Sequence, residues 1–162
     1  MVIDYTYFDN IFTRIPAVLT CDRNGEPTEA ARAARADLHT LIATYEGKFL
    51  ADLLGASWAQ LLDNTEVLAL VRNDQERTSP IAKYVWCKWA QMQATRTTAA
   101  GEKVKQGEFS SNANPVWRIA QVWNSMVDDC AVVVATLADS TAVDIAPNLQ
   151  SEIFERQNIF GI

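Results

Sequence analysis

The residues that most often carry enzyme chemistry are few and scattered in this chain. His39 is the single histidine, so a Ser-His-Asp triad or a histidine-ligated metal site would have to use it. It falls beside a predicted apolar stripe that contains Leu38, Leu41 and Ile42. A lone histidine in such a place is typical of a boundary residue rather than of a catalyst or a ligand.

Carboxylates and thiols show no spacing typical of a site either. Asp128 and Asp129 are neighbours on a predicted helix, where successive side chains point about 100° apart, so we expect solvated charges rather than a shared metal ion. Cys21, Cys87 and Cys130 form no Cys-x-x-Cys pair, which argues against a zinc site or a disulfide framework. Cys87 and Cys130 fall within helical patterns and are expected to be buried thiols.

The motif content of the sequence also favours a protein without catalytic chemistry. The sequence contains no HExxH, P-loop or GxGxxG pattern, and these are the short motifs with a clear mechanism. We predict that the protein is not an enzyme and uses no cofactor or metal. A helical hydrolase with scattered carboxylates is the alternative, which a stoichiometric divalent ion in the purified protein would support.

Composition is that of one folded domain with an acidic surface. The chain has 162 residues, of which 49% are hydrophobic and 21% charged, with a net charge of −6. This length supports a real core, and the acidity argues against a whole-surface nucleic-acid binder while leaving room for a local basic patch. No apolar run approaches the roughly 20 residues that span a bilayer. The first residues lack the regions of a secretory signal, so we expect no membrane contact and folding in a cytoplasm.

Two tryptophan-rich helices are the clearest elements of the sequence. Each is predicted to begin where a polar residue is followed by proline, at Ser79-Pro80 and Asn114-Pro115, because such residues cap a helix and start its first turn. The first helix has an apolar face that ends at Trp89 and Met92. The second repeats apolar residues every three or four positions for about six turns.

The remaining elements are predicted to be helical as well. Residues 1–20 favour one or two short helices with Pro16 as a break, and Thr28 is a good N-cap for a long helix that ends near Gly55. Gly47 inside that helix indicates a kink or a close helix crossing. Residues 56–73 favour one or two short helices, although periodicity alone leaves a buried strand open for 67–71. The chain is therefore predicted to be all-α, with 1–147 as a helical domain.

Between the tryptophan-rich helices lies a loop, residues 94–114, that is long for a compact helical domain. It carries Arg96, Lys103 and Lys105, while Lys83 and Lys88 lie on the helix before it. A solvated loop is one interpretation. The other is a basic projection that contacts an acidic partner surface or nearby DNA.

The final segment, 148–162, is predicted to be a C-terminal arm. Chain ends are usually polar and mobile, but this one carries apolar side chains that need burial in this subunit or in another. We favour docking onto another chain. The candidate anchors are Ile153, Phe154, Ile159, Phe160 and Ile162.

Trp86 and Trp117 lie off the main apolar stripes of their helices. Indoles in such positions indicate a second packed surface, either against another helix of the chain or against a neighbouring subunit. Packing within the chain is the more common outcome, and both residues are candidates for a subunit interface.

Several of these segments together resemble one family. The run SPIAKYVWCKW, the TTAAGE element that follows and SSNANPVWRIAQVWNSMVDD, with Tyr45–Gly55 upstream, are similar to the neck proteins of tailed phages. These are head–tail connector, adaptor or completion proteins. The similarity covers roughly the middle two-thirds of the chain and rests on a pattern rather than on a diagnostic motif.

This resemblance implies an all-α protein made in a bacterial host cytoplasm and located in the neck of the virion. It implies a homo-oligomeric ring, often of twelve subunits, which binds the portal protein, extends the DNA channel and receives the tail or further neck proteins. The loop and the arm would then grip neighbours, with Arg96, Lys103 and Lys105 near packaged DNA. The alternative from a different class is a small non-enzymatic adaptor or regulatory protein that binds one partner.

Overall fold

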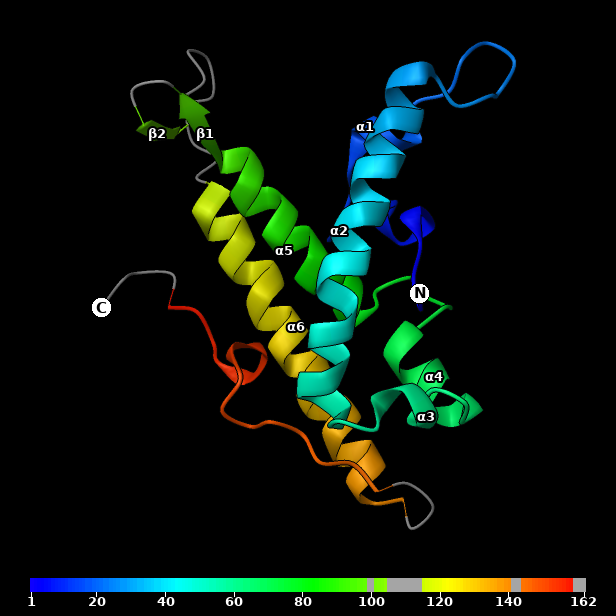
Figure 1. Ribbon diagram of the computed structural model, residues 1–162, viewed down its shortest axis with the longest axis vertical. Helices are drawn as coiled ribbons and strands as arrows, with labels where there is room; N and C mark the ends of the chain where they lie inside the picture. The colour runs from blue at the N-terminus through cyan, green and yellow to red at the C-terminus, as the bar shows by residue number, and fades with distance from the viewer. Residues whose placement is uncertain (99–100, 105–114, 141–143, 159–162) are drawn as a thin grey trace.

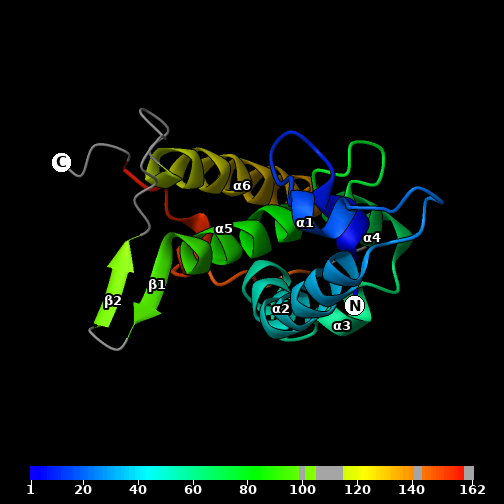
Figure 2. The ribbon, with the colours of Figure 1, turned by 90° about the horizontal axis from the view of Figure 1, so that it is seen from above.

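The computed structural model describes residues 1–98, 101–104, 115–140 and 144–158, and for 94–98, 101–104 and 115 it describes the backbone alone. The described chain is mostly helical, which confirms the predicted all-α class, with one small hairpin (Figure 1). Two long helices, α5 (Pro80–Ala94) and α6 (Pro115–Ala138), lie side by side and α2 (Glu29–Leu54) crosses them. Seen from above, α5 lies between α6 and α2 (Figure 2).

The start and the end of α2 follow the sequence signals. The Thr28 hydroxyl accepts a hydrogen bond from the Ala31 N–H at 3.1 Å, which satisfies one of the free N–H groups of the first turn. Gly55 ends the helix at φ 94°, and a Cβ there would lie 2.8 Å from the Ala146 carbonyl oxygen. Both the conformation and the close approach therefore require glycine. The helix α2 continues through Gly47, and a Cβ added there would make only an ordinary contact with the Trp58 ring, so no close helix crossing requires glycine at this position.

The N-terminal segment holds two short helices, a 3-10 helix at Tyr5–Phe8 and α1 at Pro16–Leu19. Pro16 begins α1 and does not break a helix, so that part of the prediction is wrong. The Asn10 side chain accepts hydrogen bonds from the N–H groups of Phe12 and Thr13, and this local turn replaces helical pairing. Ile11 is consequently 82% exposed.

Helices α3 (Trp58–Leu61) and α4 (Thr65–Arg72) lie beside the lower part of α2, at the lower right of Figure 1. The segment 67–71 is helical, so the strand alternative is excluded. The Asn64 side chain caps α4 by accepting the Glu66 N–H, and Asn73 ends it with a left-handed φ of 44°. Asparagine tolerates that conformation better than most residues.

The core forms where α2, α5 and α6 meet. Its largest fully buried side chains include Tyr84, Phe49, Leu50 and Met126. The rings of Phe49 and Trp123 lie 5.2 Å and 5.8 Å from that of Tyr84, within the range of favourable aromatic pairs.

The expected long loop between α5 and α6 begins as an antiparallel hairpin. Strand β1 (Thr95–Thr98) pairs with β2 (Gly101–Val104), and the hairpin extends beyond the ends of α5 and α6 (Figure 1). The Thr-rich first strand fits this structure, since β-branched residues favour extended backbone.

Candidate interaction surface

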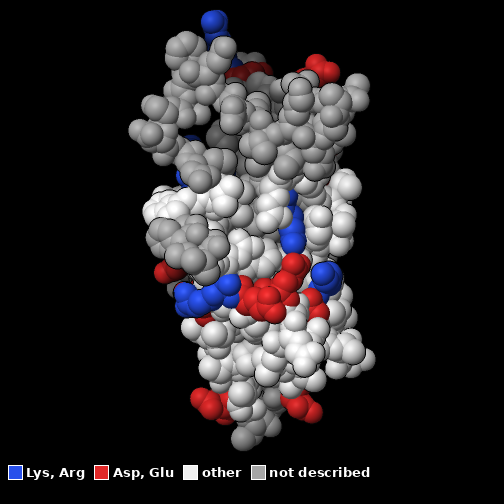
Figure 3. Space-filling model, turned by 90° about the vertical axis from the view of Figure 1, so that its left-hand side faces the viewer, with Lys and Arg blue, Asp and Glu red and all other residues white. Residues whose placement is uncertain are grey.

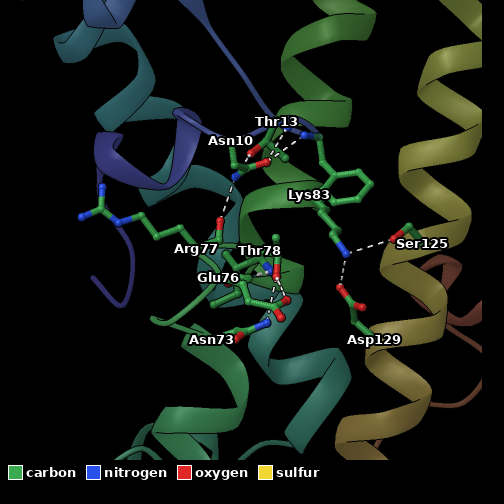
Figure 4. A network of polar contacts seen from close by, with 12 residues as sticks. Asn10, Thr13, Asn73, Glu76, Arg77, Thr78, Lys83, Ser125 and Asp129 are labelled. Carbon is green, nitrogen blue, oxygen red and sulfur yellow. Dashed lines mark hydrogen bonds and ion pairs between the residues drawn. The ribbon is translucent and has the colours of Figure 1, made fainter.

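A buried ion pair joins the two tryptophan-rich helices (Figure 4). Lys83 on α5 is only 4% exposed, and its Nζ lies 2.5 Å from Asp129 Oδ2 and 3.0 Å from Ser125 Oγ. Burial raises the pKa of Asp129, although the hydrogen bond and charge of Lys83 oppose that change. The Lys83 ammonium thus contacts two side chains of α6, and these contacts orient α5 against α6.

The predicted basic projection is therefore smaller than the sequence indicated. Lys83 lies inside the body, and Lys88 binds the Glu152 carboxylate at 3.1 Å. Lys88 also lies over the rings of Tyr84 and Trp123, at 5.0 Å and 5.2 Å from their centres. Both lysines lie on the packed face of α5, and their charges pair with carboxylates of the same chain that are partly exposed.

Glu152 is the polar centre of the C-terminal segment. Its Oε1 accepts hydrogen bonds from Tyr84 Oη at 2.8 Å and from Lys88, and Lys48 Nζ lies 3.6 Å away. Burial would raise the pKa of Glu152, but these hydrogen bonds and the two lysine charges outweigh it and lower that pKa. Figure 3 shows acidic side chains flanked by basic ones on this side of the molecule.

Residues 144–158 pack along the chain's own helices. Ile153 is fully buried in the core, and Phe154 packs partly against it. The indole N–H of Trp123 donates to the Glu155 carbonyl at 2.8 Å, and the Asn124 side chain pairs with the backbone of Gln157. The interpretation of Ile153 as an anchor for another chain is thus corrected, because its burial is satisfied within this one.

The predicted boundary between 147 and 148 does not separate two bodies in the described structure. Asn148 N–H donates to the Asp52 carbonyl at 2.8 Å, and Ser151 Oγ donates to Asp52 Oδ2 at 2.7 Å. A short 3-10 helix, Glu152–Phe154, continues this contact. The other predicted arm residues, Ile159, Phe160 and Ile162, lie outside the described residues.

The two off-stripe tryptophans differ in their surroundings. Trp86 is 5% exposed and packs near Trp89, with the Arg118 guanidinium 5.5 Å from its ring centre. Trp86 packs within the chain, so it does not offer a contact surface to a neighbouring subunit. Trp117 is 49% exposed and stays a candidate for an interface.

An apolar groove lies on the other side of α5, between α1, α2 and α5. It has a volume of about 490 Å³, and its apolar lining includes Leu38, Leu41, Trp89 and Met92. Met92 is 58% exposed, although its helical spacing predicted a place on the packed face. The groove was missed because the sequence does not show where α2 and α5 separate.

Two of the three predicted loop cations belong to the hairpin. Arg96 on β1 and Lys103 on β2 are register partners, so the fold places two cationic residues opposite each other beyond the helical body. Lys105 lies outside the described residues.

The histidine and the buried cysteines lie in different surroundings in the described structure. No group of three or more histidine, cysteine or acidic side chains is placed to hold a metal within them. His39 is exposed on α2. Cys87 and Cys130 are buried as predicted, and burial raises the pKa of both thiols, that of Cys87 to about 12.

Comparison with known proteins identifies no relative. No protein-family model, no curated protein and no solved structure matches the chain. Among its described helices, none combines the length and the hydropathy that a bilayer crossing requires.

Proposed function

We propose that this protein is a virion structural protein that forms a ring between the portal and the tail of a tailed phage and extends the DNA channel. The observation that carries the proposal is the hairpin, which places Arg96 opposite Lys103 beyond the ends of α5 and α6 on an otherwise acidic protein. The two strands carry Arg96 and Lys103 against one acidic residue, Glu102, and an element with an excess of positive charge at one end of a helical body is suited to contact the phosphates of DNA.

The helical body supports an assembly role. Its core joins α2, α5 and α6 through aromatic packing and the pair of Lys83 with Asp129, so the hairpin extends from a packed helical body. The resemblance of the two tryptophan-rich segments to phage neck proteins supports the same proposal. In this role the chain binds copies of itself, the portal protein and further neck or tail proteins.

Location tests the proposal directly. A gold-labelled antibody against this protein, viewed by electron microscopy on particles from its source, is expected to mark a single vertex or the neck. A tail-fibre or capsid antibody on the same particles serves as the control for access. Particles that stay unlabelled while the epitope is shown to be accessible would contradict a neck role.

A small adaptor protein is the second candidate, and the half-exposed Trp117 favours it because exposed indoles often anchor a partner. Affinity capture of one host protein at one-to-one stoichiometry, with unlabelled particles, would support the adaptor role. A stoichiometric complex with the portal protein would support the ring.

A further inference from the structure

We infer that copies of this chain associate head to tail, with Trp117 of one copy seated in the apolar groove between α1, α2 and α5 of the next. The inference deepens the proposed ring and rests on it for its biological setting. Its physical basis is that one chain carries both an exposed apolar knob and an unfilled apolar groove on different faces.

The knob consists of Val116, Trp117 and Arg118 in the first turn of α6. Val116 and Trp117 are 61% and 49% exposed, whereas Ile119, Ala120 and Trp123 of the next turns are buried. A tryptophan side chain can bury about 150–250 Å², and tryptophan is among the residues that contribute most to binding at interfaces.

The groove offers a surface of matching chemistry. Its described lining is aliphatic and aromatic apart from Thr40, Thr44, Gln93 and Asp37, and Asp37 is the one charged residue among them. The volume of about 490 Å³ accommodates a large side chain together with part of its helical turn. Met92 at its edge is more than half exposed, so an apolar wall faces solvent in the single chain.

Charge complementarity favours a second copy as the occupant. Arg118 follows Trp117 in the chain and is exposed, with its guanidinium 5.5 Å from the centre of the Trp86 ring, and Asp37 is part of the groove lining. Arg118 donates one hydrogen bond to the Ile11 carbonyl at 3.2 Å, and a guanidinium has further N–H donors for a carboxylate. Opposite charges beside an apolar contact set its orientation.

A chain cannot fill its own groove in this way. Trp117 belongs to α6, the groove lies on the α1–α2 side of α5, and α5 stands between them (Figure 2). A knob and a groove on different faces produce a heterologous contact, which closes into a ring when the rotation between copies permits.

Self-association of the full chain tests the inference, measured by sedimentation velocity and native mass spectrometry up to about 1 mM, where weak contacts are populated. Trp117→Ala and Met92→Glu are each expected to weaken it by at least about thirtyfold. Val132→Ala and Val132→Glu are the matched controls, since Val132 is 61% exposed on another part of α6. Both controls should associate as the wild type does, and circular dichroism should show that all four variants are folded.

Mixing the Trp117→Ala and Met92→Glu variants tests the contact more directly. Trp117→Ala keeps its groove and Met92→Glu keeps its knob, so the mixture is expected to form a one-to-one dimer and nothing larger. A wild-type chain that stays monomeric at about 1 mM, or variants that assemble as well as the controls, would overturn the inference. Neck labelling with unaffected assembly would leave the proposed function standing while this contact failed. Assembly through Trp117 without neck labelling would support this contact and contradict the proposed function.

Discussion

Lys83 and Asp129 lie 46 residues apart in the chain, yet the Lys83 ammonium is 2.5 Å from the Asp129 carboxylate between α5 and α6. The lysine side chain is 5% exposed and the aspartate side chain 32%. Packing of α5 against α6 buries the Lys83 charge, and a buried charge without a partner lowers stability. The packing of the two helices therefore depends on the Asp129 carboxylate.

Asp129→Asn is expected to lower the free energy of unfolding by about 3 kcal/mol, because it leaves the Lys83 charge buried and unpaired. Urea unfolding at pH 7 measures it. Asp128→Asn is the matched control, since Asp128 pairs with Arg156 on the exposed surface, where a pair contributes about 1 kcal/mol or less. Equal losses of unfolding free energy in the two variants would contradict the difference between a buried and an exposed pair. The double variant Lys83→Met with Asp129→Leu should recover stability, because it removes both charges.

Ile153→Ala is expected to destabilise the fold by about 2–4 kcal/mol, since it removes a fully buried side chain and leaves a cavity. Leu149→Ala, four residues earlier and 67% exposed, should change stability by less than about 0.5 kcal/mol. Thermal unfolding compares the two. An unchanged melting temperature for Ile153→Ala would mean that the C-terminal segment is not part of the core.

Glu152 is expected to stabilise the native state above the ordinary glutamate pKa. Its pKa is lowered in the fold, so the native carboxylate is favoured, and this stabilisation is lost as the pH falls from about 4.5 through the native pKa. Glu152→Gln should cost about 1 kcal/mol at pH 7 and progressively less in acid. Urea unfolding from pH 7 to pH 3 measures this, with Glu155→Gln as the control. A cost that does not depend on pH would contradict the assignment.

Thiol labelling should separate the three cysteines. Cys21 is exposed, whereas Cys87 and Cys130 are buried and burial raises their pKa, so the thiolates that react are scarce. One equivalent of a chromogenic disulfide is expected to react in the native protein, and two more after denaturation. Cys21→Ser should abolish the first reaction, and three fast equivalents in the native state would be inconsistent with this fold.

Neutral replacement of Arg96, Lys103 and Lys105 by glutamine is expected to slow DNA packaging or retention if the hairpin faces the channel. Each lost phosphate contact reduces the salt dependence of binding by about one unit of slope. Arg23→Gln, in the exposed turn after α1, is the control. Wild-type phage yield from the triple variant would remove these residues from the proposed site.

The helices themselves were predictable because their signals are local. Thr28 before α2, Ser79-Pro80 before α5 and the three-and-four spacing of α6 each act within a few residues, where capping and side-chain periodicity decide the backbone. The structure differs from the prediction at Pro16 and at the strands Thr95–Thr98 and Gly101–Val104, where local patterns compete, since a turn at Asn10 and a hairpin formed there.

Local pattern could not decide which surface each side chain meets. Trp86 and Trp117 occupy similar off-stripe positions, yet Trp86 packs inside the chain and Trp117 faces solvent. The sequence allowed Ile153 to be buried in this chain or in another subunit. It is buried in this chain because residues 144–158 pack against α2 and α6.

The sequence by itself therefore determined the helical class, where the main helices begin and the absence of the short catalytic motifs sought. Only the tertiary structure decided that Lys83 pairs with Asp129, that the C-terminal segment completes the core and that a groove opens beside α5. The reason is physical, since helix formation depends on neighbours along the chain, whereas burial and charge pairing depend on residues brought together from distant positions.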